Sequence, residues 1–124
     1  MDPKALIEAA LSARAHAYAP YSKYQVGAAV LGKSGRVYPG CNVENASYGL
    51  SVCAERVAIF RAIAEGEPEI TALTVVTETD ATPCGACRQV LYEFGTAARV
   101  ILAGKDGTFR EVGIDNLLPD PFVL

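Results

Sequence analysis

Two short motifs bring together residue types that could build a catalytic metal site. The first is Cys53-Ala54-Glu55, and the second is Pro83-Cys84-Gly85-Ala86-Cys87. Cys84 and Cys87 are three residues apart, so on a helix both sulfurs can face the same point. Thiolates are soft ligands that suit zinc, and a helix N-terminus favours the deprotonated thiol. The spacing therefore predicts one zinc ion per chain, held by Cys53, Cys84 and Cys87.

Three ligands rather than four indicate a catalytic zinc. A structural site normally closes with four protein ligands, whereas three leave a position for water, whose pKa bound zinc lowers from about 15.7 to about 7. Cys41 has no matching spacing, and we interpret it as a small buried residue. Two alternatives remain open. One is a structural site that recruits Cys41, and the other is a redox Cys-x-x-Cys pair, which would leave Cys53-Ala54-Glu55 without a role.

Glu55 and Arg56 are the residues expected to support the metal chemistry. Glu55 lies two positions from a ligand, so its carboxylate can take a proton from metal-bound water and deliver it to a substrate nitrogen. Burial beside thiolates should raise its pKa. Three thiolates and Zn²⁺ leave an excess negative charge, so we expect Arg56 to donate hydrogen bonds to the sulfurs, with Arg88 as a second candidate. A zinc-binding module without catalysis would have no need of Glu55.

The elements that must position these residues alternate between helices and strands. Asp2 and Pro3 mark the start of a helix that includes His16, and Gly32-Lys33-Ser34-Gly35 marks a hairpin turn. The remaining pattern predicts strands over 26–31, 36–41, 70–77, 99–103 and 108–112, helices over 53–65 and 84–94, and at most a short helix within 114–119. This order indicates an α/β fold, a three-layer α/β/α sandwich around a five-stranded mixed sheet. We expect one domain over residues 1–124.

Composition restricts the class of partner. The chain carries 11 Lys and Arg against 14 Asp and Glu, a formal net charge of −3. That balance favours a small-molecule substrate over a nucleic-acid polymer, because phosphate contacts need a basic surface. No apolar run could span a bilayer and no secretory signal is visible, so we expect a cytoplasmic protein without membrane contact. His16, the single histidine, is interpreted as a core or surface residue rather than a ligand.

The two cysteine motifs resemble the zinc-dependent cytidine deaminase family, most closely its short, homotetrameric, three-cysteine subclass. Tyr18-Ala19-Pro20-Tyr21-Ser22, Gly40-Cys41-Asn42-Val43-Glu44-Asn45-Ala46 and Leu117-Leu118-Pro119 are similar to the same family, so the likeness covers nearly the whole chain. It implies hydrolytic deamination of cytidine and 2′-deoxycytidine to uridine and 2′-deoxyuridine with release of ammonia, in pyrimidine salvage. In that reaction zinc-bound hydroxide attacks C4, while Glu55 shuttles protons to N3 and to the leaving amine.

The resemblance also implies which residues of one subunit bind the nucleoside. Asn42 and Glu44 would bind the ribose hydroxyls, since an amide and a carboxylate both pair with sugar hydroxyls. Backbone groups near Ala54 would read the base. Tyr24 stands where the family generally carries Phe, so its ring would lie against the pyrimidine while its hydroxyl needs a further partner.

A neighbouring subunit would complete the site. By the same resemblance, Ala46, Tyr48 and Phe122 would come from that neighbour, in a homotetramer with active sites at the subunit junctions. The same zinc chemistry on another aminopyrimidine nucleoside, such as a blasticidin-type antibiotic, is an alternative. Glu44, close to Asn42, favours a substrate with a free ribose.

Overall fold

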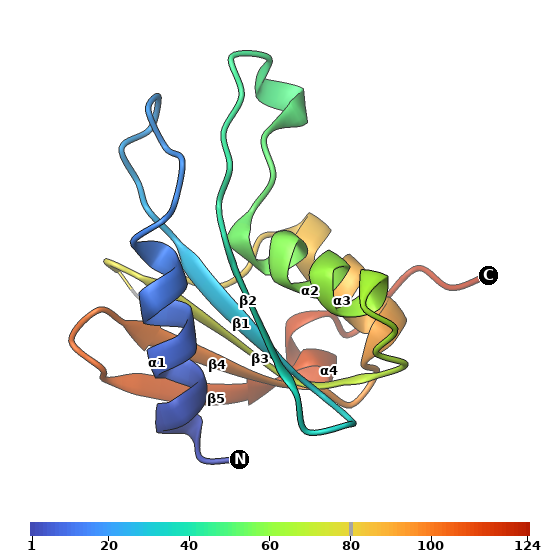
Figure 1. Ribbon diagram of the computed structural model, residues 1–124. Coiled ribbons are helices and arrows are strands. Elements are labelled where there is room, and N and C mark those ends of the chain that lie inside the picture. Colours follow the sequence, from blue (N-terminus) through green and yellow to red (C-terminus); the bar gives the residue numbers. More distant parts are fainter. Residues whose placement is uncertain (80) are drawn as a thin grey trace.

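A five-stranded mixed sheet forms the middle layer of the computed structural model, which describes residues 1–79 and 81–124 (Figure 1). The strand order is β2-β1-β3-β4-β5; β3 and β4 run parallel, and the other neighbouring pairs are antiparallel. The elements in chain order are α1 (Pro3–Arg14), β1 (Gly27–Gly32), β2 (Val37–Cys41), η1 (Tyr48–Leu50), α2 (Ala54–Ala64), β3 (Ile70–Thr77), α3 (Gly85–Phe94), β4 (Arg99–Gly104), β5 (Phe109–Gly113) and α4 (Ile114–Leu117). Because β3 reaches β4 through α3, the start of α3 follows the carboxyl end of β3.

Helices cover both faces of the sheet, which confirms the predicted three-layer α/β/α sandwich (Figure 1). On one face, α1 buries Leu6 and Ala10 together with Ala29 of β1. On the other face, α2 packs over Ala28 and Val30 of the same strand, and α3 packs beside α2 and adds Leu91 to the same hydrophobic cluster. Alternate residues of β1 therefore point to opposite layers, as the pleat of a strand requires. None of the helices, within the part of the chain that the structure describes, has the length and apolar character that a bilayer span requires.

The first helix ends earlier than its sequence predicts. α1 stops at Arg14, so the expectation that it includes His16 is wrong. The His16 N–H donates to the Ala13 carbonyl at 2.9 Å in a closing turn, and the chain then extends until the Tyr18 N–H donates to the Asn42 carbonyl at 3.0 Å. Pairing with a distant segment replaces further helix here, and local spacing carries no signal of that pairing.

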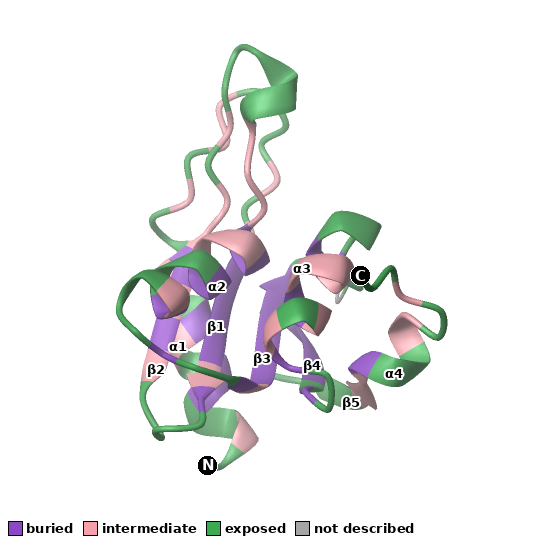
Figure 2. Cartoon of the chain, turned by 90° about the vertical axis from the view of Figure 1, so that its right-hand side faces the viewer, coloured by how far each residue is buried: buried purple, intermediate pink, exposed green. Residues whose placement is uncertain are grey.

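Two loops, residues 15–26 and 42–53, project from the same end of the sheet (Figure 1). They are joined by a bridge between Tyr18 and Val43, and Val43 in turn bridges to Val52. Figure 2 shows that the outer parts of these loops are exposed, in contrast to the buried central strands. The second loop contains η1, which the sequence did not predict. These loops carry most of the residues expected to touch a nucleoside.

Close packing at Gly40 fixes where α2 begins. A Cβ atom at Gly40 would lie 2.6 Å from the backbone nitrogen of Ala58 and 2.9 Å from the carbonyl oxygen of Ala54. Real Cβ contacts are longer, so only glycine allows β2 and α2 to lie at this separation. The first turn of α2, with Cys53 and Glu55, is thereby held against the sheet.

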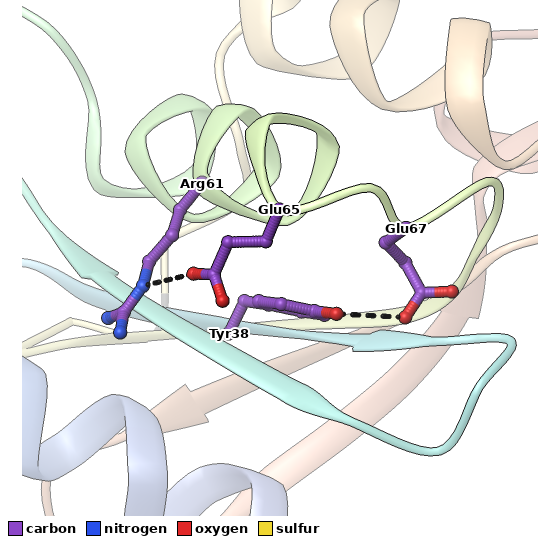
Figure 3. A network of polar contacts seen from close by, with 4 residues as sticks. All are labelled: Tyr38, Arg61, Glu65 and Glu67. Atoms are coloured by element: carbon purple, nitrogen blue, oxygen red, sulfur yellow. Dashed lines mark hydrogen bonds and ion pairs between the residues drawn. The ribbon is translucent and has the colours of Figure 1, made fainter.

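A buried carboxylate fastens the segment after α2 to the β1–β2 hairpin (Figure 3). Glu67 accepts hydrogen bonds from the Ser34 N–H at 3.2 Å, from the Ser34 hydroxyl, and from the Tyr38 hydroxyl at 3.1 Å. The bonds from Ser34 hold the pKa of Glu67 below its usual range. Glu65 instead lies at the surface, where it pairs with Arg61 at 3.0 Å.

We expect Glu67 to make folding sensitive to acid. A carboxyl group whose folded pKa lies below its unfolded pKa, about 4.3 for Glu, stabilises the fold above that value, and this contribution disappears as pH falls through the folded pKa. Between about pH 7 and pH 3, the free energy of unfolding in urea should therefore fall more steeply for the parent protein than for Glu67→Gln. Glu65→Gln is the matched control and should follow the parent. Equal pH dependence in parent and Glu67→Gln would contradict this role.

Candidate active site

Three cysteine sulfurs converge where α2 and α3 begin. The Sγ atoms of Cys53, Cys84 and Cys87 all lie within 4.8 Å of one another. Cys84 Sγ is 3.9 Å from Cys53 Sγ and 3.5 Å from Cys87 Sγ. Cys53 and Cys84 are the N-cap residues of α2 and α3, and Cys87 lies in the first turn of α3. The structure therefore brings together the three residues expected as ligands.

These separations fit a tetrahedral zinc ion. Zn–S bonds of about 2.3 Å at tetrahedral angles place neighbouring sulfurs about 3.8 Å apart. The two pairs that include Cys84 are 3.9 Å and 3.5 Å apart, and the third pair lies within 4.8 Å. Among the described residues, no fourth cysteine, histidine or carboxylate joins the group, and Cys41 lines a different cavity. A metal held by these sulfurs keeps a coordination position for water or substrate, as catalytic zinc sites do.

The backbone around the sulfurs favours negative charge. A helix N-terminus leaves its first N–H groups without helical partners and carries the positive end of the helix dipole. Two such ends meet here, and neither Cys53 nor Cys84 makes a side-chain capping hydrogen bond. Neither sulfur is therefore engaged by the backbone of the helix that it precedes.

The pKa values of Cys53 and Cys87 are shifted in opposite directions. The pKa of Cys53 is lowered to about 5, because polar contact with Cys87 and the N–H of Arg56 stabilise its thiolate. The pKa of Cys87 is raised, because its thiolate would lie beside that of Cys53 and its side chain is buried. A divalent cation displaces such protons when it binds, so metal binding here is coupled to proton release.

Arg56 places positive charge beside the cluster. Its Nη2 donates to Cys53 Sγ over 3.6 Å, and this hydrogen bond raises the pKa of Arg56. Its Nε is buried and has no hydrogen-bond partner among the described residues. A guanidinium group in this position offsets the excess negative charge of three thiolates.

Arg88 contacts oxygen atoms rather than sulfur. Its Nε donates to the Pro83 carbonyl at 2.8 Å, its Nη1 to the Leu117 carbonyl at 2.9 Å, and its Nη2 to Thr82 Oγ1 at 3.0 Å. These bonds tie the β3–α3 loop to the end of α4. The hypothesis that Arg88 donates to the sulfurs is wrong, because each of its guanidinium nitrogens is engaged elsewhere.

Glu55 is a buried carboxyl group next to the sulfurs. It lies in the first turn of α2 and is 5% exposed. Burial raises the pKa of Glu55 to about 7. Glu55 lines the same cavity of about 300 Å³ as Cys53 and Cys84. A carboxyl group with a pKa near neutral can both accept and donate a proton there.

The remaining walls of this cavity combine expected and unexpected residues. The substrate-binding candidates that line it are Tyr24, Asn42, Glu44 and Ala54. The residues that the sequence did not indicate are Ser22, Val26, Val75, Thr77, Ala81 and Thr82. The end of the predicted strand over 70–77 could have indicated Thr77, since ligands of α/β folds gather at carboxyl ends of strands.

Asn42 and Glu44 also shape the loop opposite them. Asn42 Oδ1 accepts from the Val26 N–H at 2.9 Å, and its Nδ2 donates to the Tyr24 carbonyl at 2.9 Å. Glu44 accepts from the Ser22 N–H at 3.1 Å and from the Ser22 hydroxyl, and this pairing lowers the pKa of Glu44. An amide and a carboxylate each offer about four hydrogen-bonding positions, so both side chains keep capacity for a ligand.

Ala46, Tyr48 and Phe122 do not line the cavity of their own subunit. Tyr48 is 78% exposed on the second projecting loop, where its ring meets that of Tyr21 edge-on with centroids 6.3 Å apart. Phe122 is 69% exposed. Gln89 holds the Phe122 backbone, donating to its carbonyl at 2.9 Å and accepting from its N–H at 3.2 Å. Both rings are therefore presented outward.

Comparisons with known proteins agree with this geometry. A family model described as "Cytidine and deoxycytidylate deaminase zinc-binding region" matches residues 1–103. Cytidine deaminase from Halalkalibacterium halodurans is 49% identical over 125 aligned positions, which cover 98% of this chain and 95% of the relative. The crystal structure of cytidine deaminase from Burkholderia pseudomallei superposes with a TM-score of 0.94 at 51% identity, covering 98% of this chain and 100% of that one. The corresponding enzyme structure from Mycobacterium tuberculosis gives a TM-score of 0.87 at 41% identity, covering 100% and 99%.

We expect Arg56→Gln to weaken metal retention without unfolding the protein. Residues that support metal ligands typically change affinity by about 10- to 100-fold when they are lost. Competition with a chromophoric chelator measures zinc affinity, and circular dichroism checks the fold. Arg61→Gln, an exposed change on the same helix, is the control and should bind zinc as the parent does. Parent-like zinc affinity in folded Arg56→Gln would rule out this role.

Proposed function

The chain belongs to the cytidine and deoxycytidylate deaminase family, and from that membership we propose that it converts cytidine and 2′-deoxycytidine with water to uridine and 2′-deoxyuridine, releasing ammonia. One observation carries the proposal: the buried Glu55 carboxyl group shares a cavity with sulfurs of the three-cysteine cluster. A structural metal site has no use for such a carboxyl group, whereas hydrolysis of an amidine needs a proton carrier. Relatives named cytidine deaminase, similar over almost the whole chain, support cytidine as the substrate.

Glu55 carries the protons of the reaction. Cys53, Cys84 and Cys87 would hold zinc, which supplies an activated water molecule as the nucleophile. The Glu55 carboxylate accepts the proton that this water loses and delivers it to N3 of the pyrimidine, because C4 is a poor electrophile until the ring nitrogen is protonated. The carboxylate then takes the remaining proton of the hydroxyl that has added to C4 and gives it to the exocyclic amine, so that the C4 carbonyl forms as the C–N bond breaks and ammonia leaves. Water and cytidine are consumed, and uridine and ammonia are formed.

The cavity also offers a place for each part of the nucleoside. We assign the ribose hydroxyls to Asn42 and Glu44, whose amide and carboxylate line the cavity and keep unused hydrogen-bonding positions. We assign the pyrimidine to the space between the Tyr24 ring and the start of α2, where backbone groups at Ala54 can read the base. Aromatic rings favour such offset contacts with planar ligands.

We expect Glu55→Gln to abolish most of the turnover while the protein stays folded and zinc-loaded. Glutamine keeps the size of the side chain but cannot carry a proton, and general acid–base catalysis contributes about 10²- to 10⁴-fold. The loss of cytidine absorbance measures kcat, with adenosine and free cytosine as poor substrates for comparison. Elemental analysis should find one zinc per chain in both proteins. Glu65→Gln, an exposed change at the C-terminal end of the same helix, is the control, and a parent-like kcat in Glu55→Gln would eliminate the mechanism.

We also propose a homotetramer whose active sites lie at subunit junctions. Tyr48 and Phe122 are largely exposed, Ala46 is exposed on the same loop as Tyr48, and none of the three lines the cavity of its own subunit, which supports this arrangement. A second, largely apolar cavity of about 510 Å³ lies between α1, β2 and α2, and Phe60 of α2 is 49% exposed. Exposed apolar surface favours burial against another protein.

Shared sites can be tested by complementation. Glu55→Gln and Tyr48→Ala, each purified alone, should be weakly active. When the two are co-expressed, some sites combine intact Glu55 from one subunit with intact Tyr48 from its neighbour, so kcat/KM should exceed that of either variant at equal total protein. Glu55→Gln co-expressed with Glu55→Ala is the control and should show no recovery. Absence of recovery in the first mixture, or a fully active monomer in solution, would contradict shared sites.

The setting we propose is cytoplasmic pyrimidine salvage, acting on free nucleosides rather than on nucleic-acid polymers. All four cysteines are free thiols, as a reducing compartment maintains them. The net charge of −3 gives no general attraction to phosphate. We treat residues 1–124 as one domain, because both hydrophobic clusters pack on the same sheet.

A further inference from the structure

A hydrogen bond joins the two loops on either side of the cavity mouth. The Tyr24 hydroxyl lies 2.8 Å from Thr79 Oγ1. Tyr24 lines the cavity from loop 15–26, and Thr79 belongs to the β3–α3 loop, whose Ala81 and Thr82 line it from the other side. We propose that this hydrogen bond, called the latch below, holds the Tyr24 ring in the position where it contacts the pyrimidine. Thr79 is then a positioning residue for substrate binding. This proposal rests on the function proposed above.

The backbone of Tyr24 is already fixed from two directions. Its N–H donates to Ser22 Oγ at 3.0 Å, and its carbonyl accepts from Asn42 Nδ2 at 2.9 Å. Lys23, the preceding residue, has a φ of 62°, in the left-handed region that residues with a side chain seldom adopt. Such strain persists where the surrounding contacts over-determine the conformation. These contacts fix the direction in which the Tyr24 side chain leaves the loop, and its hydroxyl group meets Thr79 Oγ1.

The loop on the other side is fixed independently. The Ala81 N–H donates to Thr77 Oγ1 at 2.9 Å, and Arg88 donates to Thr82 Oγ1 and to the Pro83 carbonyl. This loop ends at Cys84, so its position is also tied to the sulfur cluster. In the described part of the chain, no other side-chain hydrogen bond connects it with loop 15–26. Loss of the latch would therefore leave the hydrogen bonds within each loop in place, but each loop would fluctuate more because nothing of this kind ties it to the other.

The latch should act on binding rather than on the chemical step. The hydroxyls of Tyr24 and Thr79 pair with each other, and neither donates to Glu55 or to the sulfurs among the described contacts. An interaction that stabilises substrate and transition state equally changes KM and leaves kcat unchanged. A net hydrogen bond of this type corresponds to a change of about two- to tenfold.

Steady-state kinetics on cytidine with the zinc-loaded protein test the latch through a double-mutant cycle. Tyr24→Phe keeps the ring and Thr79→Val keeps the shape, so each should raise KM about two- to tenfold with kcat unchanged within about twofold. The double variant should be no worse than either single variant, since one bond is lost in all three. Thr79→Ser, which restores the hydroxyl, should return KM to the parent value. Tyr92→Phe and Thr96→Val, away from the cavity, are the matched controls.

Two results would overturn the latch: unchanged KM in both single variants, or effects that add in the double variant. Hydrogen exchange gives a readout that does not depend on turnover. In Tyr24→Phe, the backbone N–H groups of residues 21–26, 78–79, 81–82 and 84 should exchange faster than in the parent. If the parent fails to deaminate cytidine, the proposed function fails. In that case, faster exchange in both segments of Tyr24→Phe would still support the latch, and unchanged exchange would contradict it.

Discussion

Electrostatic repulsion among three closely spaced thiolates is the main physical constraint on this structure. Three sulfurs within 4.8 Å of one another are stable as anions only if positive charge surrounds them. Two helix N-termini, the guanidinium of Arg56 and a bound cation supply that charge together. The geometry of α2 and α3 follows from this need, because Cys53 and Cys84 must both cap a helix at the same point. Gly40 and the parallel β3–α3–β4 connection are what bring those two helix starts together.

The placement of Glu55 depends on the same point. Glu55 lies two residues after Cys53, in the first turn of α2, and its carboxyl group is buried where α2 packs on the sheet. Burial raises the pKa of Glu55 to about 7, so a group that is usually ionised becomes able to carry a proton in neutral solution. One helix start thus holds, within four residues of sequence, the residues to which we assign a metal ligand, a charge-balancing arginine and a proton carrier. The substrate side of the cavity, by contrast, is assembled from loops that are distant in sequence.

The contrast between local and long-range contacts explains which parts of the fold and of the site could be predicted from the sequence. The layer order, the strands and the convergence of Cys53 with Cys84 follow from hydrophobic periodicity and from the cap positions of two predicted helices, which are local signals. The pairing of Tyr24 with Thr79, the three oxygen contacts of Arg88 and the early end of α1 depend on segments far apart in the chain. No short window of sequence encodes such contacts, because they form only once the sheet has brought the segments together. The outward position of Tyr48 was suggested by family resemblance alone.

The coordination number of the metal tests this description most directly. Zinc K-edge X-ray absorption on the holoprotein reports the atoms bound to the ion, and elemental analysis reports how many ions each chain holds. We expect one zinc per chain with three sulfurs at about 2.3 Å and one lighter atom, oxygen or nitrogen, at about 2.0 Å. Exchange of that lighter atom on addition of a nucleoside would be consistent with an open position. Four sulfur ligands, which would require Cys41, or fewer than three, would contradict the central claim.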